Sequence, residues 1–233
     1  MFKKVLSFIL LSSLIGCSTI LLRIGKPREL EIVEAIKKGK VEAKTQGAGI
    51  EEVNMELKRL ARYELSINIP VGTYFISHGS AQNMVGTTEE TVILQDDDWH
   101  SISISVACAN RAKDIPSEEE TFDIQRSPHQ AELKRLMPAL RKANVDFAVQ
   151  QAAVWIVTDD ANYEDLGTLE GRYAWQLIPT RMIREYEAAL AMKICDEAGI
   201  DITQKAIWRD RKDILKELED EDLTNWLEQK AQQ

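Results

Sequence analysis

Cysteine and histidine are scarce in this chain of 233 residues, which holds only three of each. So few cysteines do not form a disulfide scaffold; they are Cys17, Cys108 and Cys195. The histidines lie far apart and lack neighbours at the spacing of metal ligands; they are His78, His100 and His129. We therefore expect surface or hydrogen-bonded histidines, and no metal site.

Motifs that carry a recognisable chemistry are also missing. We find no Gly-x-Ser-x-Gly, no phosphate-binding glycine loop and no zinc-type spacing. There is no internal repeat and no low-complexity tract. The net charge of −9 argues against nucleic acid and against a polybasic membrane face. We therefore predict a non-enzymatic protein with no catalytic residue, no cofactor and no nucleic-acid partner.

A short hydrophobic run near the start is too brief to cross a membrane. Lys3 and Lys4 precede an apolar run, interrupted only by serines, that extends from Val5 to Leu14. A membrane-spanning helix needs roughly 20 predominantly apolar residues. A positive start followed by a short apolar run and a small residue is typical of a secretory signal peptide.

The end of this segment, Leu14-Ile15-Gly16-Cys17, resembles the lipobox of bacterial lipoproteins. The resemblance implies a signal peptide of residues 1–16, removed before Cys17, and a diacylglyceryl group on the Cys17 thiol. An ordinary signal peptide with an incidental Cys17 is the alternative. Ser18, rather than Asp, follows the cysteine, which in Gram-negative lipoproteins implies the outer membrane. The expected location is the bacterial cell envelope, with the membrane reached through the lipid.

Cleavage before Cys17 would leave 217 residues and, with two lysines removed, change the net charge to −11. That length suits one or two compact domains. We expect residues 17–38 to form a lipid tether and a short helix, with the helix between Glu29 and Lys38.

Alternation of apolar and polar residues predicts strands in residues 39–110. It is clearest at Ile102, Ile104, Val106 and Cys108, which alternate with serines. Short alternating strands separated by turns favour an antiparallel, immunoglobulin-like β-sandwich. Asp96-Asp97-Asp98 lies between two such strands, so we interpret it as a solvated turn rather than a calcium site.

Residues 111–233 are predicted to be an α-helical half, which makes the fold class α+β. Residues 111–125 are polar and irregular, and Ser127-Pro128 is expected to begin a helix that Pro138 would kink or split. Pro179-Thr180 is expected to begin another, with Ile183, Tyr186, Leu190 and Ile194 as its apolar stripe and Gly199 as its left-handed end. The residues from Lys212 onward predict an amphipathic C-terminal arm.

The segment Phe147 to Thr158 is apolar on nearly all sides, which is typical of a helix central to a core. We expect Trp155 to be buried there between the strands and the helical half. Asp159 to Asp165 follows with a calcium-loop-like alternation. It lacks the required Gly and Glu, so we interpret it as a helix end followed by a turn.

Gln151-Ala152-Ala153-Val154-Trp155 resembles the Gln-x-Ala-Ile-Trp helix of thioester domains on Gram-positive surface proteins, with Val154 in place of Ile. The resemblance, over residues 106–158, implies a bond between Gln151 and the upstream Cys108 that reacts with nucleophiles on a host. The residues themselves leave two structural alternatives open. Gln151 is then a buried amide bonded to strand backbone, and Cys108 is a buried apolar side chain or a disulfide partner of Cys195.

Two functions therefore remain open from the sequence. The first is a lipid-anchored envelope protein that binds a protein or glycan ligand without catalysis. The alternative is a covalent surface adhesin that uses a thioester between Cys108 and Gln151.

Overall fold

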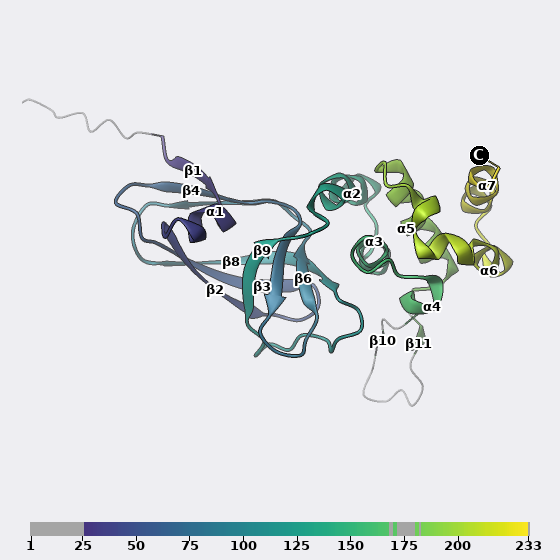
Figure 1. The fold of residues 1–233 in the computed structure, drawn as a ribbon, viewed down its shortest axis with the longest axis horizontal. Coiled ribbons are helices and arrows are strands. Elements are labelled where there is room, and N and C mark those ends of the chain that lie inside the picture. Colours follow the sequence, from purple (N-terminus) through teal and green to yellow (C-terminus); the bar gives the residue numbers. More distant parts are fainter. Residues whose placement is uncertain (1–25, 168–169, 172–179, 182, 233) are drawn as a thin grey trace, which may run out of the picture.

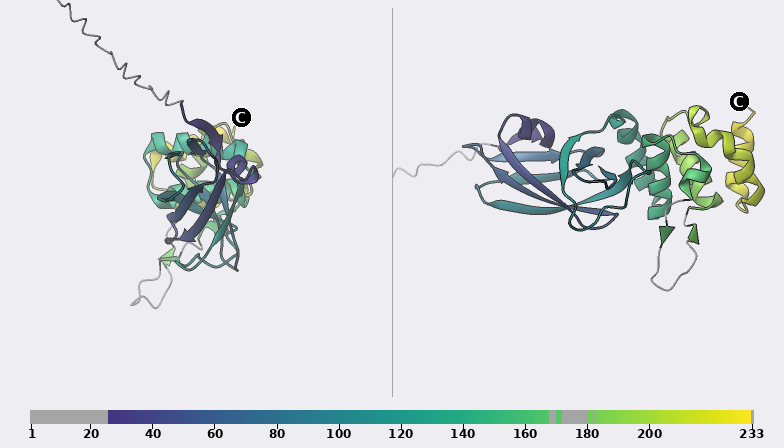
Figure 2. Two further views of the ribbon diagram at one scale, coloured as in Figure 1. Left: turned by 90° about the vertical axis from the view of Figure 1, so that its left-hand side faces the viewer. Right: turned by 60° about the horizontal axis from the view of Figure 1, so that its bottom comes forward.

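The structure is a computed structural model that describes residues 26–167, 170–171, 180–181 and 183–232. It combines antiparallel β-sheets with several helices, so the expected mixture of α and β structure is confirmed (Figure 1). The strand-rich part and the helical part lie end to end (Figure 2). The predicted signal peptide, Cys17 and most of the tether lie outside the described residues.

A three-stranded sheet lies next to the start of the described chain. It consists of β1 (Arg28–Glu31), β4 (Leu65–Ile69) and β7 (Glu90–Leu94), with β1 parallel to β4 and β7 antiparallel to it. The short helix α1 (Ile32–Lys37) follows β1 directly. The sequence predicted only tether and helix here, and β1 corrects this: so short a strand is defined by its partner β4, not by its own pattern.

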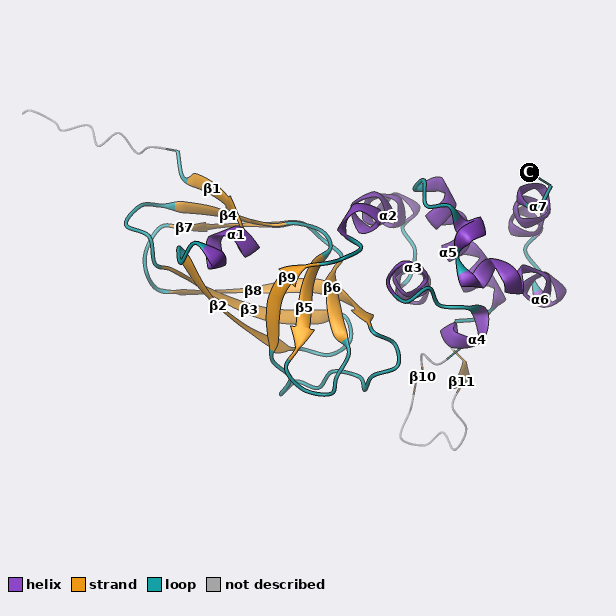
Figure 3. Cartoon of the chain, viewed as in Figure 1, coloured by secondary structure: helices purple, strands orange, loops and turns teal. Residues whose placement is uncertain are grey.

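The remaining strands form one six-stranded, antiparallel sheet that nearly closes on itself (Figure 3). Its order is β2 (Val41–Gly47), β3 (Glu52–Arg59), β8 (Trp99–Ala109), β6 (Asn83–Gly86), β5 (Thr73–Ser77) and β9 (Phe122–Arg126). The two outer strands meet where the Thr45 hydroxyl donates to the Phe122 carbonyl over 2.6 Å. This topology does not establish an immunoglobulin-like sandwich, which stays a prediction.

Strand β9 corrects the expectation that residues 111–125 are irregular and that the helical half starts at residue 111. It pairs with β5 from Thr73↔Arg126 to Ser77↔Phe122. Its sequence is mostly polar because only Phe122 is buried and the other side chains are at least partly exposed. A strand of this kind carries little hydrophobic alternation.

Helices make up most of the rest. In chain order they are α2 (Gln130–Ala143), α3 (Phe147–Thr158), α4 (Tyr163–Leu166), α5 (Glu185–Glu197), the short 3₁₀ turns η1 (Ile202–Gln204) and η2 (Ala206–Asp210), α6 (Arg211–Glu217) and α7 (Glu221–Lys230). Two antiparallel strands of two residues each, β10 (Glu170–Gly171) and β11 (Thr180–Arg181), lie between α4 and α5. Helix α3 begins and ends at the predicted residues.

Two helix starts differ from the predictions. Helix α2 begins at Gln130, not at Ser127-Pro128, because the Ser127 hydroxyl accepts the His129 N–H in a turn over 3.1 Å. Helix α5 begins at Glu185, because Thr180–Arg181 is paired as a strand. Pro138 lies within α2, which continues through it.

Two further details of the helical half are corrected. Tyr186, placed by the sequence in the apolar stripe of α5, is 47% exposed, and the buried face consists mainly of small residues. The C-terminal arm is two helices, α6 and α7, instead of one. Ile214, Leu223 and Leu227 are buried, and α6 and α7 both pack against α5. Gly199 has the predicted left-handed conformation, with φ +74°.

The buried apolar side chains form one continuous cluster that runs from both sheets through α3 into α5 and α7. Within the residues that the structure describes, no helix has the length and apolar character needed to cross a membrane.

Candidate functional site

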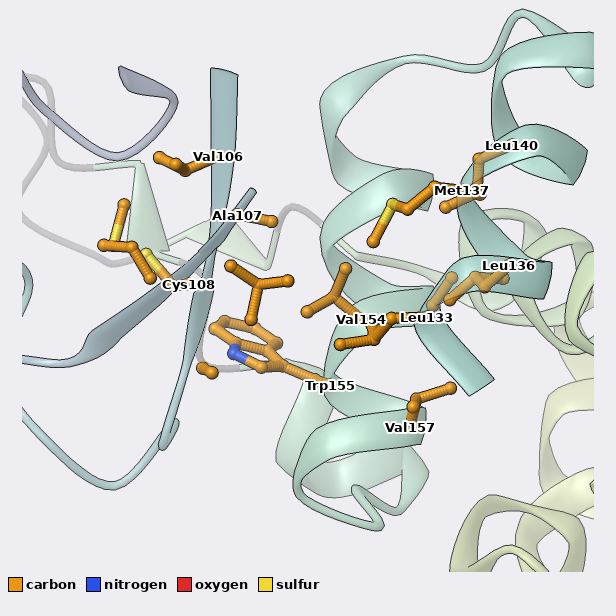
Figure 4. Packing of buried hydrophobic residues seen from close by; sticks show 14 of the residues in the cluster. Val106, Ala107, Cys108, Leu133, Leu136, Met137, Leu140, Val154, Trp155 and Val157 are labelled. Atoms are coloured by element: carbon orange, nitrogen blue, oxygen red, sulfur yellow. The ribbon is translucent and has the colours of Figure 1, made fainter. Parts of the chain in front are cut away.

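Helix α3 joins the strand-rich part to the helical part. The Asp146 carboxylate caps its first turn by accepting the Val149 N–H over 3.1 Å. Figure 4 shows Val154 and Trp155 of α3 next to Ala107 of β8, with Leu133 and Met137 of α2 close by. Because the helix is apolar on all sides, it is packed between sheet and helices, as the sequence predicted.

The structure brings the two residues of the thioester resemblance into direct contact. The Gln151 carboxamide oxygen accepts the Cys108 backbone N–H over 2.8 Å, and its nitrogen donates to the Cys108 carbonyl over 2.8 Å. Gln151 is completely buried, so these bonds satisfy polar groups that water cannot reach.

The position of this contact explains why a glutamine is needed. Strand β3 pairs with β8 only as far as Ser105, and Val106 donates the last bond to Glu51 over 2.9 Å. Beyond that point no strand of the described residues lies beside the same edge of β8. The Gln151 amide occupies this place and pairs with Cys108 as the peptide group of a neighbouring strand would. We call this contact the amide junction.

The Cys108 thiol is not part of the amide junction. Figure 4 shows its side chain directed away from α3, on the same side of β8 as Val106. Burial raises the pKa of the Cys108 thiol to about 12. At neutral pH only about one thiol in 10⁵ would then be the nucleophilic thiolate. The local environment favours a structural cysteine.

Cys195 is separate from Cys108. Both thiols are free and buried, which contradicts the disulfide between them that the sequence left open. The Cys195 sulfur lies 4.0 Å from the Ala153 carbonyl of α3, and burial raises its pKa to about 12. Each cysteine therefore acts as a small apolar side chain in the core.

Trp155 is only 2% exposed and lies on α3 beside β8, where the sequence predicted a buried residue. Its indole Nε1 has no hydrogen-bond partner within the described chain. An unpaired buried donor costs about 1–3 kcal/mol. Apolar packing of the large ring outweighs this cost.

Each histidine has a carboxylate partner. Nε2 of His78 lies 3.0 Å from Asp123, and Nε2 of His100 lies 2.8 Å from Asp96. His129 Nδ1 lies 3.4 Å from Glu132. Among the described ranges, no three His, Cys, Asp or Glu side chains are grouped as they would be around a metal ion.

The two acidic segments that the sequence singled out have structural roles. Asp96 accepts the Asp98 N–H over 3.2 Å within the turn between β7 and β8. At the end of α3, Asp159 accepts the Arg111 N–H over 3.0 Å and so ties the exit of β8 to the helix. Asn162 and Asp165 cap the start of α4. The structure thus gives these carboxylates backbone partners.

A groove of about 950 Å³ was not expected from the sequence. It lies on the solvent-facing side of β2, β3 and β8, and we call it the sheet groove. Two cross-strand rows line its floor, namely Lys44, Glu56 and Ser101, then Gln46, Asn54 and Ser103. In the sequence, the groove is indicated only by the serines that alternate along β8. They do not reveal the groove by themselves, because the sequence does not show which strands lie beside β8.

Comparisons with protein-family models, with curated proteins and with solved structures find no match to this chain. The functional inference therefore depends on the residues and contacts described above.

Proposed function

We propose that this chain is a lipid-anchored protein of the bacterial cell envelope that binds a ligand without catalysis. The observation that carries the proposal is Leu14-Ile15-Gly16-Cys17, which follows two lysines and a short apolar run. Two or three acyl chains would make the anchor stable, because a single chain holds only marginally. The envelope would be the outer membrane in a Gram-negative cell.

Binding is favoured over catalysis by how the described polar residues are used. The carboxylates near α3 accept backbone N–H groups, and Gln151 bonds to the backbone of β8. The sheet groove, by contrast, offers side chains that are exposed to solvent. In this proposal the strand-rich part is the immunoglobulin-like sandwich that the sequence predicts, and the sheet groove is its binding site.

The anchor is tested by Cys17→Ser. Cells expressing the full chain or the variant are grown with labelled palmitate, and membranes are separated from soluble fractions. The parent is expected to carry label and to stay with the membrane, whereas the variant should remain uncut and unlabelled. Equal labelling of the two proteins would contradict the assignment of Cys17. Cys195→Ser serves as the control and should be labelled like the parent.

A second candidate is the covalent adhesin, whose supporting observation is that the Gln151 amide lies against the Cys108 backbone. It would require the Cys108 side chain to turn toward α3. The thiol would displace ammonia from the Gln151 amide and leave a thioester that host amines open. Titration of thiols in denaturant distinguishes the two candidates. In Cys17→Ser the binding protein should show two thiols, from Cys108 and Cys195, and the adhesin only one. Mild hydroxylamine would restore the second thiol of the adhesin.

A further inference from the structure

The charged side chains around the sheet groove are few and of both signs. Lys44 and Glu56 are cross-strand neighbours in the β2–β3 register. The Lys44 ammonium also lies 4.0 Å from the centre of the Trp99 ring. The ring attracts the ammonium group and so draws it away from the row of Gln46, Asn54 and Ser103. On the opposite wall His78 is paired with Asp123. No concentration of one charge is available for a strongly ionic ligand.

The floor of the sheet groove has unused hydrogen-bonding capacity. Asn54, Ser101 and Ser103 are exposed, and within the described residues their side chains have no hydrogen-bond partner. An amide supplies two donors and an acceptor, and each hydroxyl is both donor and acceptor. Cross-strand neighbours are about 5 Å apart and successive rows about 7 Å apart. Such a grid matches a ligand that carries hydroxyl groups at short, regular intervals.

The main chain at the sheet groove is already in use. The backbone groups of β3 are bonded to β2 on one side and to β8 on the other. The outer edges β2 and β9 meet each other through Thr45 and Phe122. A peptide that adds to a sheet edge as an extra strand needs free backbone groups. Over the floor formed by β3 and β8, the groove does not offer them.

From this chemistry we infer that the sheet groove binds a neutral oligosaccharide, with Asn54, Ser101 and Ser103 bonded to its hydroxyl groups. The inference rests on the proposed function, because it names the ligand class and the site of that binding protein. The Gln46 side-chain amide donates a hydrogen bond to the Glu118 carbonyl over 2.7 Å. Gln46 therefore positions the loop that contains Glu118, beside the groove.

The test uses the purified, full mature protein in detergent and measures binding by calorimetry. The probes are tetrasaccharides of glucose, mannose, galactose and N-acetylglucosamine in both anomeric linkages. Polygalacturonate and extended peptides form the acidic and peptide arms. The groove variant is Asn54→Ala/Ser103→Ala. The control is Glu52→Ala/Ser105→Ala, which truncates the adjacent cross-strand pair on the same face, outside the groove lining.

At least one neutral tetrasaccharide is expected to bind, and the groove variant should weaken its affinity about tenfold or more, since two hydrogen bonds are lost. The control should bind like the parent. The inference is overturned if no neutral probe binds, if only acidic or peptide probes bind, or if the groove variant binds as tightly as the parent. Labelling at Cys17 is read separately, so failure of the anchor and failure of the groove are distinguishable.

Discussion

At the scale of single residues, the amide junction shows how a side chain can complete a sheet. The carboxamide of Gln151 supplies both a donor and an acceptor to Cys108 at the place where β3 has ended. Among side chains only Asn and Gln carry a carboxamide, which has the geometry of a peptide group, and Gln has the longer reach. The residue type at position 151 therefore follows from the backbone of β8.

Gln151→Leu should destabilise the protein, because the Cys108 N–H and carbonyl would be buried without partners. The expected loss in the free energy of unfolding is about 1–3 kcal/mol for each group left unpaired. Gln150→Leu is the matched control, because Gln150 is on the same helix but has no side-chain hydrogen bond to β8. This variant should change the free energy of unfolding little. Urea unfolding monitored by tryptophan fluorescence measures both. Equal effects would show that the two hydrogen bonds contribute little.

The Cys108 thiol should make the free energy of unfolding depend on pH in the alkaline range. Burial raises its pKa from 9.0 to about 12 in the folded chain, so the native state holds the proton more tightly. Its contribution is therefore complete below the unfolded pKa and is lost as pH rises toward the folded pKa. The stability difference between the parent and Cys108→Ala should shrink between about pH 8 and about pH 11. A difference that stays constant or grows would contradict the burial of the thiol.

At the scale of elements, helix α3 is apolar on nearly all sides because most of its side chains are buried. Ala107 of β8 lies on one side of it and α2 on another (Figure 4), and α5 also packs against it. Trp155 is buried between α3 and β8, and α3 packs against β8 as well as α2 and α5, so both parts of the fold depend on this helix.

Trp155→Ala should therefore reduce the free energy of unfolding by about 3–5 kcal/mol, as expected for a large aromatic truncated in a core. Trp155→Phe should cost less, because it keeps most of the ring volume and removes an indole N–H that has no partner. Both are read from chemical denaturation. A cost below about 1 kcal/mol for the alanine variant would place Trp155 at the surface.

How much the sequence could predict differs from element to element. Helix α3 was predictable from its long apolar run, and strand β8 from its alternation of apolar and polar residues. Strands β1 and β9 were not, since their short, mostly polar sequences are strands only because β4 and β5 lie beside them. The same holds for the sites. The sequence placed Cys108 and Gln151 near each other on two inward faces, but α3 packs on the other face of β8 and the contact is made through the Cys108 backbone. The sheet groove could not be predicted, because it needs the neighbours β3 and β8, which are distant in sequence.

At the scale of the whole molecule, the strand-rich and helical parts share one core. The buried cluster is continuous from Leu65 in the first sheet, through Trp155, to Leu227 in α7. We expect thermal or urea unfolding to occur in one transition, with near-ultraviolet and far-ultraviolet circular dichroism changing together. Two separate transitions would mean that α3 does not couple the parts.

We propose that the mature protein carries a lipid at Cys17 and has an unmodified amide junction. The intact mass of the mature protein, purified from membranes, tests both features at once. We predict a chain that begins at Cys17, carries the mass of a diacylglyceryl group with or without a further acyl chain, and otherwise has its full calculated mass. A mature chain without lipid, or one that lacks the mass of one ammonia and regains it in Cys108→Ala, would contradict the account.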